Sequence, residues 1–143
     1  MQPLASSSGG LRILVADDFL DSAESLQILL SLWGHEVLVT HRGWATLAVV
    51  QEFRPHIAFV DLQMPDLNGG EVAKKLRQFP GFERLILVAA TGHDPDEESF
   101  KPYLKHFDHY LRNPFNLTEL ERILACYSSS GAESGTSLGE TGT

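Results

Sequence analysis

Residues 56–61 read HIAFVD, and this short stretch indicates the fold most directly. The apolar run that ends at Val60 is typical of a strand buried on both faces, and it leads straight into Asp61. The turn-forming residues 65–70 come next. Beyond them, three apolar residues are spaced as the inner face of a helix: Val72, Ala73 and Leu76. The pattern predicts a strand, a loop and a helix in succession.

The same alternation extends in both directions along the chain. The other strands are predicted at Leu11–Ala16, Glu36–Thr40, Leu85–Ala90 and Asp108–Leu111. The other helices are predicted at Phe19–Trp33, Trp44–Phe53, residues 95–106 and Asn116–Tyr127. Apolar strands that alternate with helices predict an α/β fold, in which helices cover both faces of a parallel sheet.

Composition fits one domain of 143 residues, with 43% hydrophobic residues to form a core. The net charge of -8 disfavours a nucleic-acid-binding surface. Cys126 is the only cysteine, so nothing indicates an oxidising compartment. No apolar run is long enough to cross a bilayer, and the N-terminus lacks the pattern of a signal peptide. We therefore expect a cytoplasmic protein that does not bind membranes or nucleic acid.

Both ends of the chain differ in composition from the rest. Residues 1–10 and 128–143 are rich in serine and glycine and contain little that is apolar. Such sequences are typical of flexible segments. We therefore expect a flexible N-terminal segment at 1–10, one domain at 11–127 and a flexible tail at 128–143.

Polar residues follow the predicted strands at the edge where open parallel sheets bind ligands. They are Asp17, Asp18, Asp61, Thr91 and Asn113, and Pro114 comes directly after Asn113. Three carboxylates in one place repel one another and hold protons more tightly unless a cation joins them. Oxygen ligands without histidine or cysteine favour a hard cation, and Mg²⁺ fits best. The sequence therefore predicts a magnesium site at this edge.

Each of these residues also has a simpler interpretation. Asp17 or Asp18 could cap the helix that follows the first strand, and Thr91 could be an ordinary loop hydroxyl. Taken singly, the signals are weak. Their joint placement at the ends of strands in one alternating pattern favours a functional site.

With these motifs in place, the chain resembles the receiver domains of two-component signalling over residues 11–127. The resemblance rests on ILVADD, VDLQMPDLNG, AATG and YLRNPFN. Thr91 lies 30 residues beyond Asp61, and Asn113 lies 22 beyond Thr91, as the family pattern expects. The resemblance implies a flavodoxin-like (βα)5 fold, a doubly wound five-stranded parallel sheet with the strand order 2-1-3-4-5.

The resemblance also implies how the site works. Asp61 would accept a phosphoryl group from a sensor histidine kinase or a histidine phosphotransfer protein. Asp18 and Asp61 would bind Mg²⁺ together with the backbone carbonyl of Gln63, and Asp17 would act partly through water. A carboxylate is a competent covalent acceptor, and Mg²⁺ stabilises the charge of a phosphoryl group in transfer.

Two further positions resemble the family's switch residues. Thr91 would be the switch hydroxyl, and Tyr110 its aromatic partner on the fifth strand. The surface of the fourth and fifth helix–strand units would pass on the change, with a homodimer through this face as one form of output.

One position departs from the family pattern. Asn113 precedes Pro114 where relatives have a lysine, and a neutral hydrogen bond is roughly half as strong as a charged one. Neighbouring strand residues face opposite ways, so we expect Arg112 to point away from the site. We predict that binding of Mg²⁺ and phosphoryl survives while activation weakens.

Two alternative functions fit parts of the same pattern. Asn113 keeps open a pseudo-receiver, which binds partners through the same surface without useful phosphorylation. A haloacid-dehalogenase-type phosphatase would need a second aspartate two residues after Asp61, and Gln63 occupies that position. We therefore expect a signalling domain whose only chemistry is its own phosphotransfer and dephosphorylation, and not an enzyme.

Overall fold

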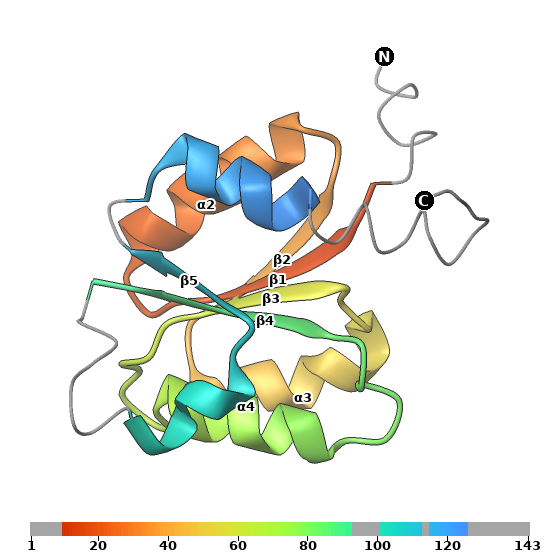
Figure 1. Cartoon of the computed structure of the whole chain (residues 1–143), viewed down its shortest axis with the longest axis vertical. Coiled ribbons are helices and arrows are strands. Elements are labelled where there is room, and N and C mark those ends of the chain that lie inside the picture. Colours follow the sequence, from red (N-terminus) through yellow and green to blue (C-terminus); the bar gives the residue numbers. More distant parts are fainter. Residues whose placement is uncertain (1–9, 93–100, 113–114, 126–143) are drawn as a thin grey trace.

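The computed structural model describes residues 10–92, 101–112 and 115–125. Five parallel strands form one sheet in the order β2-β1-β3-β4-β5, which confirms the predicted fold class and strand order. Figure 1 shows helices on both sides of this sheet. Helix α2 and the helix near the C-terminus lie on one side, and α3, α4 and η1 lie on the other.

The strands are β1 (Arg12–Ala16), β2 (Glu36–Thr40), β3 (Ile57–Val60), β4 (Ile86–Thr91) and β5 (His109–Arg112). The helices are α2 (Leu20–Leu32), α3 (Gly43–Phe53), α4 (Gly69–Gln78) and the 3₁₀ helix η1 (Lys101–His106). Residues 117–125 are also helical. Each strand lies within one residue of its predicted bounds.

The predicted fourth helix, residues 95–106, is helical over the part that is described, but it is a short 3₁₀ helix. Lys101–His106 forms a 3₁₀ helix and not an α-helix, and residues 93–100 lie outside the described chain. Pro102 is the second residue of η1. Proline is tolerated in a first helical turn, where its missing N–H would have no helical partner, and 3₁₀ geometry is typical of such short pieces.

The core consists of two layers, one on each face of the sheet. Alternate strand residues point to opposite faces of the sheet. Because both faces are covered, all four residues of β3 are buried. One layer holds Leu14, Ala58, Val60, Leu87 and Ala89 with Val72, Ala73 and Leu76 of α4. The other holds Ile13, Val15, Ile57, Phe59 and Val88 with Leu26 and Leu30 of α2 and with Leu120 and Ile123. Helical cover on both faces explains why the central strand β3 is apolar throughout, whereas the edge strands β2 and β5 keep exposed polar residues.

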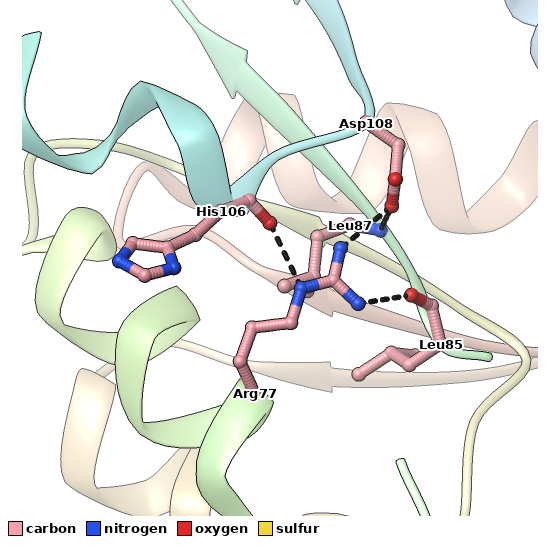
Figure 2. Close-up of polar contacts among 5 residues, drawn as sticks. All are labelled: Arg77, Leu85, Leu87, His106 and Asp108. Carbon is pink, nitrogen blue, oxygen red and sulfur yellow. Dashed lines mark hydrogen bonds and ion pairs between the residues drawn. The ribbon is translucent and has the colours of Figure 1, made fainter. Parts of the chain in front are cut away.

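Arg77 joins the end of η1 and the start of β5 to the rest of the fold. Its Nε donates to the carbonyl of His106 (3.1 Å), and its Nη1 donates to the carbonyl of Leu85 (2.7 Å). Its Nη2 lies 2.8 Å from Oδ2 of Asp108, and that same oxygen accepts from the N–H of Leu87 at 2.9 Å. Figure 2 shows the guanidinium between these three chain segments. We call this set of contacts the Arg77 junction.

A second contact holds η1 against α4. A Cβ added at Gly70 would meet the ring of Tyr103, so the absence of a side chain lets the 3₁₀ helix approach closely. The Tyr103 hydroxyl donates to Oε2 of Glu71 at 2.7 Å. The first turn of α4 therefore fixes where η1 sits.

None of the helices in the described part of the chain is both long and apolar enough to span a bilayer.

Candidate functional site

Asp17, Asp18 and Asp61 meet at the carboxyl end of the sheet. β1 and β3 are paired with Ala16 beside Val60, so the residues that follow these two strands are neighbours. The N–H of Asp61 donates to the carbonyl of Ala16 at 2.8 Å, which continues the pairing by one residue. One carboxylate oxygen from each aspartate lies within 4.8 Å of the others. The structure therefore brings together the three predicted acidic residues.

The crowding changes the proton affinity of the site. Burial raises the pKa of Asp61 to about 7, and the charges of Asp17 and Asp18 add to this effect. Burial also raises the pKa of Asp17. The sequence predicted tight proton binding through repulsion, and the structure adds burial as the larger cause. An enclosed cluster of this kind is relieved by a proton or by a cation.

Backbone contacts fix Asp17 in the cluster. Its Oδ1 accepts from the N–H of Phe19 at 3.0 Å, and its carbonyl oxygen lies 3.0 Å from Nδ1 of His41. Phe19 is the N-cap of α2 and makes no side-chain cap hydrogen bond. Asp17 therefore stabilises the turn between β1 and α2 without being the cap residue, and its carboxylate faces the other two aspartates.

The loop after Asp61 is held close to it. The N–H of Gln63 donates to Oδ1 of Asp61 at 3.2 Å, and the N–H of Gly69 donates to the carbonyl of Leu62 at 2.9 Å. A Cβ added at Gly69 would overlap the carbonyl oxygen of Asp61. Only glycine fits this approach, so Gly69 sets the position of the loop.

Asp66 anchors the same loop at its far end, and sequence reasoning missed it. Its two carboxylate oxygens accept from the N–H groups of Gly43 (2.8 Å) and Trp44 (3.0 Å), at the start of α3. These hydrogen bonds, led by that from Trp44, lower the pKa of Asp66. No local pattern indicates the contact, because Gly43 is 23 residues upstream and meets Asp66 only in the folded chain.

The three aspartates fit a hard divalent cation. Within the described residues, this is the one cluster of His, Cys, Asp or Glu side chains that meets the geometry for a shared metal, and it offers only carboxylate oxygens. Mg²⁺ is typically held by one or two carboxylates together with water and phosphate oxygens. Asp17, Asp18 and Asp61 would hold it here. Asp18 is exposed, so solvent reaches the cluster.

The other predicted site residues are placed less completely. Thr91 is the last residue of β4, one residue beyond the predicted end of that strand, and its side chain is outside what the structure describes. Tyr110 lies on β5, is 37% exposed, and has its ring centroid 6.5 Å from that of Phe107. Arg112 is exposed at the end of β5. Asn113 and Pro114 lie outside the described residues.

Known proteins resemble this chain in sequence and in fold. The family model "Response regulator receiver domain" matches residues 13–125. The response regulator MprA of Mycobacterium avium is 38% identical over 110 residues, which are 77% of this chain and 47% of MprA. The chain thus spans about half the length of that relative.

Solved structures show the same fold. A CheY-like receiver domain from Methylobacillus flagellatus matches with a TM-score of 0.75 and 28% identity, covering 83% of this chain and 99% of that one. The response regulator TrrA from Thermotoga maritima, solved in complex with Mg(2+)-BeF, matches with a TM-score of 0.70 and 24% identity. That match covers 81% of this chain and 97% of TrrA.

Proposed function

Because this chain belongs to the response-regulator receiver domain family, we propose that it accepts a phosphoryl group on Asp61 in a Mg²⁺-dependent phosphorelay. The donor is a phosphohistidine on a sensor histidine kinase or a histidine phosphotransfer protein. The observation that carries the proposal is the acidic cluster, in which one carboxylate oxygen of Asp61 lies within 4.8 Å of a carboxylate oxygen of Asp17 and of Asp18. TrrA, which has the same fold, was solved with Mg(2+)-BeF bound.

The residues of this chain prepare Asp61 for the transfer. In the reaction, a carboxylate oxygen of Asp61 forms a bond to phosphorus as the bond from phosphorus to the donor nitrogen breaks, and the freed imidazole takes up a proton. The N–H of Gln63 orients the carboxylate, and Gly69 keeps the loop against it. A Mg²⁺ ion held by the three aspartates would neutralise charge on the transferring group.

Chemical phosphorylation tests the proposal directly. Wild-type protein is incubated with acetyl phosphate and Mg²⁺, and intact-protein mass spectrometry measures the phosphorylated fraction. We expect labelling of the wild type, no labelling of Asp61→Asn, and normal labelling of Asp21→Asn, which removes an exposed carboxylate from the first turn of α2. The proposal would be contradicted if acetyl phosphate with Mg²⁺ did not modify the wild type and BeF₃⁻ with Mg²⁺ did not change its spectrum.

Asn113 is the residue that favours a second candidate, a pseudo-receiver that binds partners without useful phosphorylation. The lysine that the resemblance implies at this position would place a full charge beside the phosphoryl group, where asparagine offers a neutral hydrogen bond. We expect Asn113→Lys to strengthen the response to phosphorylation while Mg²⁺ binding is retained. An unchanged phosphorylated fraction and unchanged partner binding would show that this position does not limit signalling.

The partners follow from the same site. A kinase or phosphotransfer protein must reach the carboxyl end of the sheet, where Asp18 is exposed. Output, including homodimer formation, would use the surface of η1 and β5, on which Tyr110 is partly exposed. We place the protein in the cytoplasm, where such donors act.

A further inference from the structure

The amino end of the sheet carries a cleft with no role in the proposed phosphotransfer. It lies where β1 begins and where the chain enters β3 and β4, at the opposite edge from Asp61. Its volume is about 160 Å³. The residues used below are Arg12, Arg54, His56, Gly81, Phe82 and Arg84, and we call the cleft they line the amino-end cleft.

Three arginines line this cleft, and no acidic residue does. The single ion pair in the described part of the chain is Arg77–Asp108, elsewhere in the fold. Three like charges around one small volume repel one another. The protein as a whole carries a net charge of -8, so acidic residues are abundant elsewhere in the sequence, yet none of them lines this cleft to balance the three arginines.

Contacts with the protein hold two of the arginines in fixed positions. Nε of Arg12 donates to the carbonyls of Phe53 (3.0 Å) and Arg54 (2.8 Å). The guanidinium of Arg54 lies over the ring of Phe82, 5.1 Å from its centroid. Within the described residues, no hydrogen bond engages the terminal nitrogens of Arg12 or the guanidinium of Arg54. These donors are preorganised and still available for a ligand.

The backbone around the cleft is also specialised. Arg54 has a φ of 51°, the one positive φ outside glycine in the described chain, and Gly81 has a φ of 90°. A Cβ at Gly81 would lie 2.9 Å from Nη2 of Arg54, so glycine leaves room for the guanidinium. Arg54 is the C-cap residue of α3, and the left-handed conformation that ends this helix places the Arg54 side chain at the cleft.

The neighbouring histidine responds to the same positive field. Nδ1 of His56 accepts from the N–H of Arg12 at 3.0 Å. Burial, followed by the charge of Arg12, lowers the pKa of His56. The positive charge of the cleft therefore comes from arginine, whose charge persists at every physiological pH.

We propose that the amino-end cleft binds the polyphosphate group of a small molecule. A terminal phosphate group carries about -1.5 to -2 charges at neutral pH, each phosphate linked to it adds further negative charge, and the planar arginine fork matches phosphate oxygens in a bidentate manner. Two linked phosphates match the charge of three arginines better than one carboxylate does. The proposal does not depend on phosphorylation of Asp61, which lies at the other edge of the sheet.

Calorimetric titration with inorganic pyrophosphate tests the site. The buffer contains EDTA, so that no divalent cation bridges the ligand to the aspartate cluster. We expect one site on the wild type and affinity at least about tenfold weaker in Arg84→Gln, from loss of one charged contact. Arg84 is exposed, and its side chain makes no hydrogen bond or ion pair with the described residues, so the variant should fold normally.

Arg122→Gln is the matched control, since it removes an exposed arginine from the helix at 117–125. This variant should bind pyrophosphate as the wild type does. In the wild type, adding pyrophosphate should shift the amide NMR signals of Arg12, Gly81 and Phe82. A parallel titration with ATP distinguishes the sources: tighter binding than pyrophosphate indicates a nucleotide, and equal or weaker binding an inorganic polyphosphate. No saturable binding by the wild type, or equal weakening in Arg84→Gln and Arg122→Gln, would overturn the proposal.

Discussion

Asp61 and Asp108 are two carboxylates with similar backbone contacts and opposite surroundings. Each accepts a backbone N–H, from Gln63 at 3.2 Å and from Leu87 at 2.9 Å. Asp61 faces two further aspartates, whereas Asp108 faces the guanidinium of Arg77. Asp108 is therefore compensated from within the fold, while Asp61 depends on something that comes from outside. A site whose charge is left uncompensated can respond to ions and phosphate, and a compensated one can only stabilise.

The largest effect is expected from breaking the compensated region. Arg77→Met keeps the aliphatic part of the side chain but removes the guanidinium. The carbonyls of Leu85 and His106 and the carboxylate of Asp108 then lose the hydrogen bonds that Arg77 donates to them. Hydrogen bonds to charged groups contribute about 1.5–3 kcal/mol each to stability, and this junction is partly exposed, so we expect unfolding to be easier by about 2–3 kcal/mol. Urea denaturation measures the change.

Arg122→Met is the matched control for that substitution, because Arg122 is exposed and outside the junction. It should change the free energy of unfolding by less than about 0.5 kcal/mol. If the two variants were equally stable, the Arg77 junction would contribute nothing to the fold.

A slightly smaller effect is expected at the contact between α4 and η1. In Gly70→Ala, the added methyl meets the ring of Tyr103, and η1 must shift away from α4. Alanine favours a helix by about 1 kcal/mol over glycine, but overpacking costs about 1–3 kcal/mol, so we expect a net loss of about 1–2 kcal/mol. In a Tyr103→Ala background the same substitution should become neutral or stabilising. A loss that persists there would locate the strain elsewhere.

Asp61→Asn should increase the free energy of unfolding, whereas the two substitutions above decrease it. Because the folded-state pKa is about 7 and the unfolded value is near 3.8, stability is lost as pH rises from about 4 to 7. A full shift of this size corresponds to about 4 kcal/mol, and the partial exposure of Asp61 reduces it to about 1–2 kcal/mol. The variant should therefore be more stable than the wild type at pH 8 without Mg²⁺, and its advantage should vanish at pH 4. Equal stability at pH 8 would contradict the raised pKa.

The smallest effect is a pH dependence of Mg²⁺ binding. A proton and the cation compete for Asp61, so affinity should rise by about tenfold between pH 6 and pH 8, as expected for one group with a pKa of about 7. Calorimetry at a series of pH values measures it. In Asp61→Asn the profile should flatten, and a wild-type affinity that stayed constant over this range would be inconsistent with a protonated Asp61.

The fold and the acidic cluster could be predicted because both depend on local sequence. Apolar strands predict a parallel sheet, and a parallel sheet brings the residues after its strands to one edge. The strand order that makes β1 and β3 neighbours, and so brings Asp17 beside Asp61, was implied by the resemblance to receiver domains. The Arg77 junction could not be predicted in this way. Arg77 meets Asp108 31 residues later in the chain, and nothing in the local pattern around either residue indicates the other.

The geometry of η1 was also beyond local sequence. The pattern of residues 95–106 predicts a helix, and the described part, Lys101–His106, takes the 3₁₀ form, lies against Gly70 and ends at the carbonyl that Arg77 binds. Local sequence indicates neither contact of η1, and the same holds for Asp66, whose hydrogen bonds join the acceptor loop to the start of a distant helix.

The Arg77 junction also has an evolutionary consequence. Asp108 serves two donors at once through a single oxygen, and Arg77 serves three acceptors. Replacing Arg77 or Asp108 alone leaves the charge of the other residue unpaired, whereas replacing both with uncharged residues leaves no unpaired charge. Positions 77 and 108 should therefore tolerate joint substitution better than single substitution. Among descendants of this sequence, the two residues should be inherited or lost together.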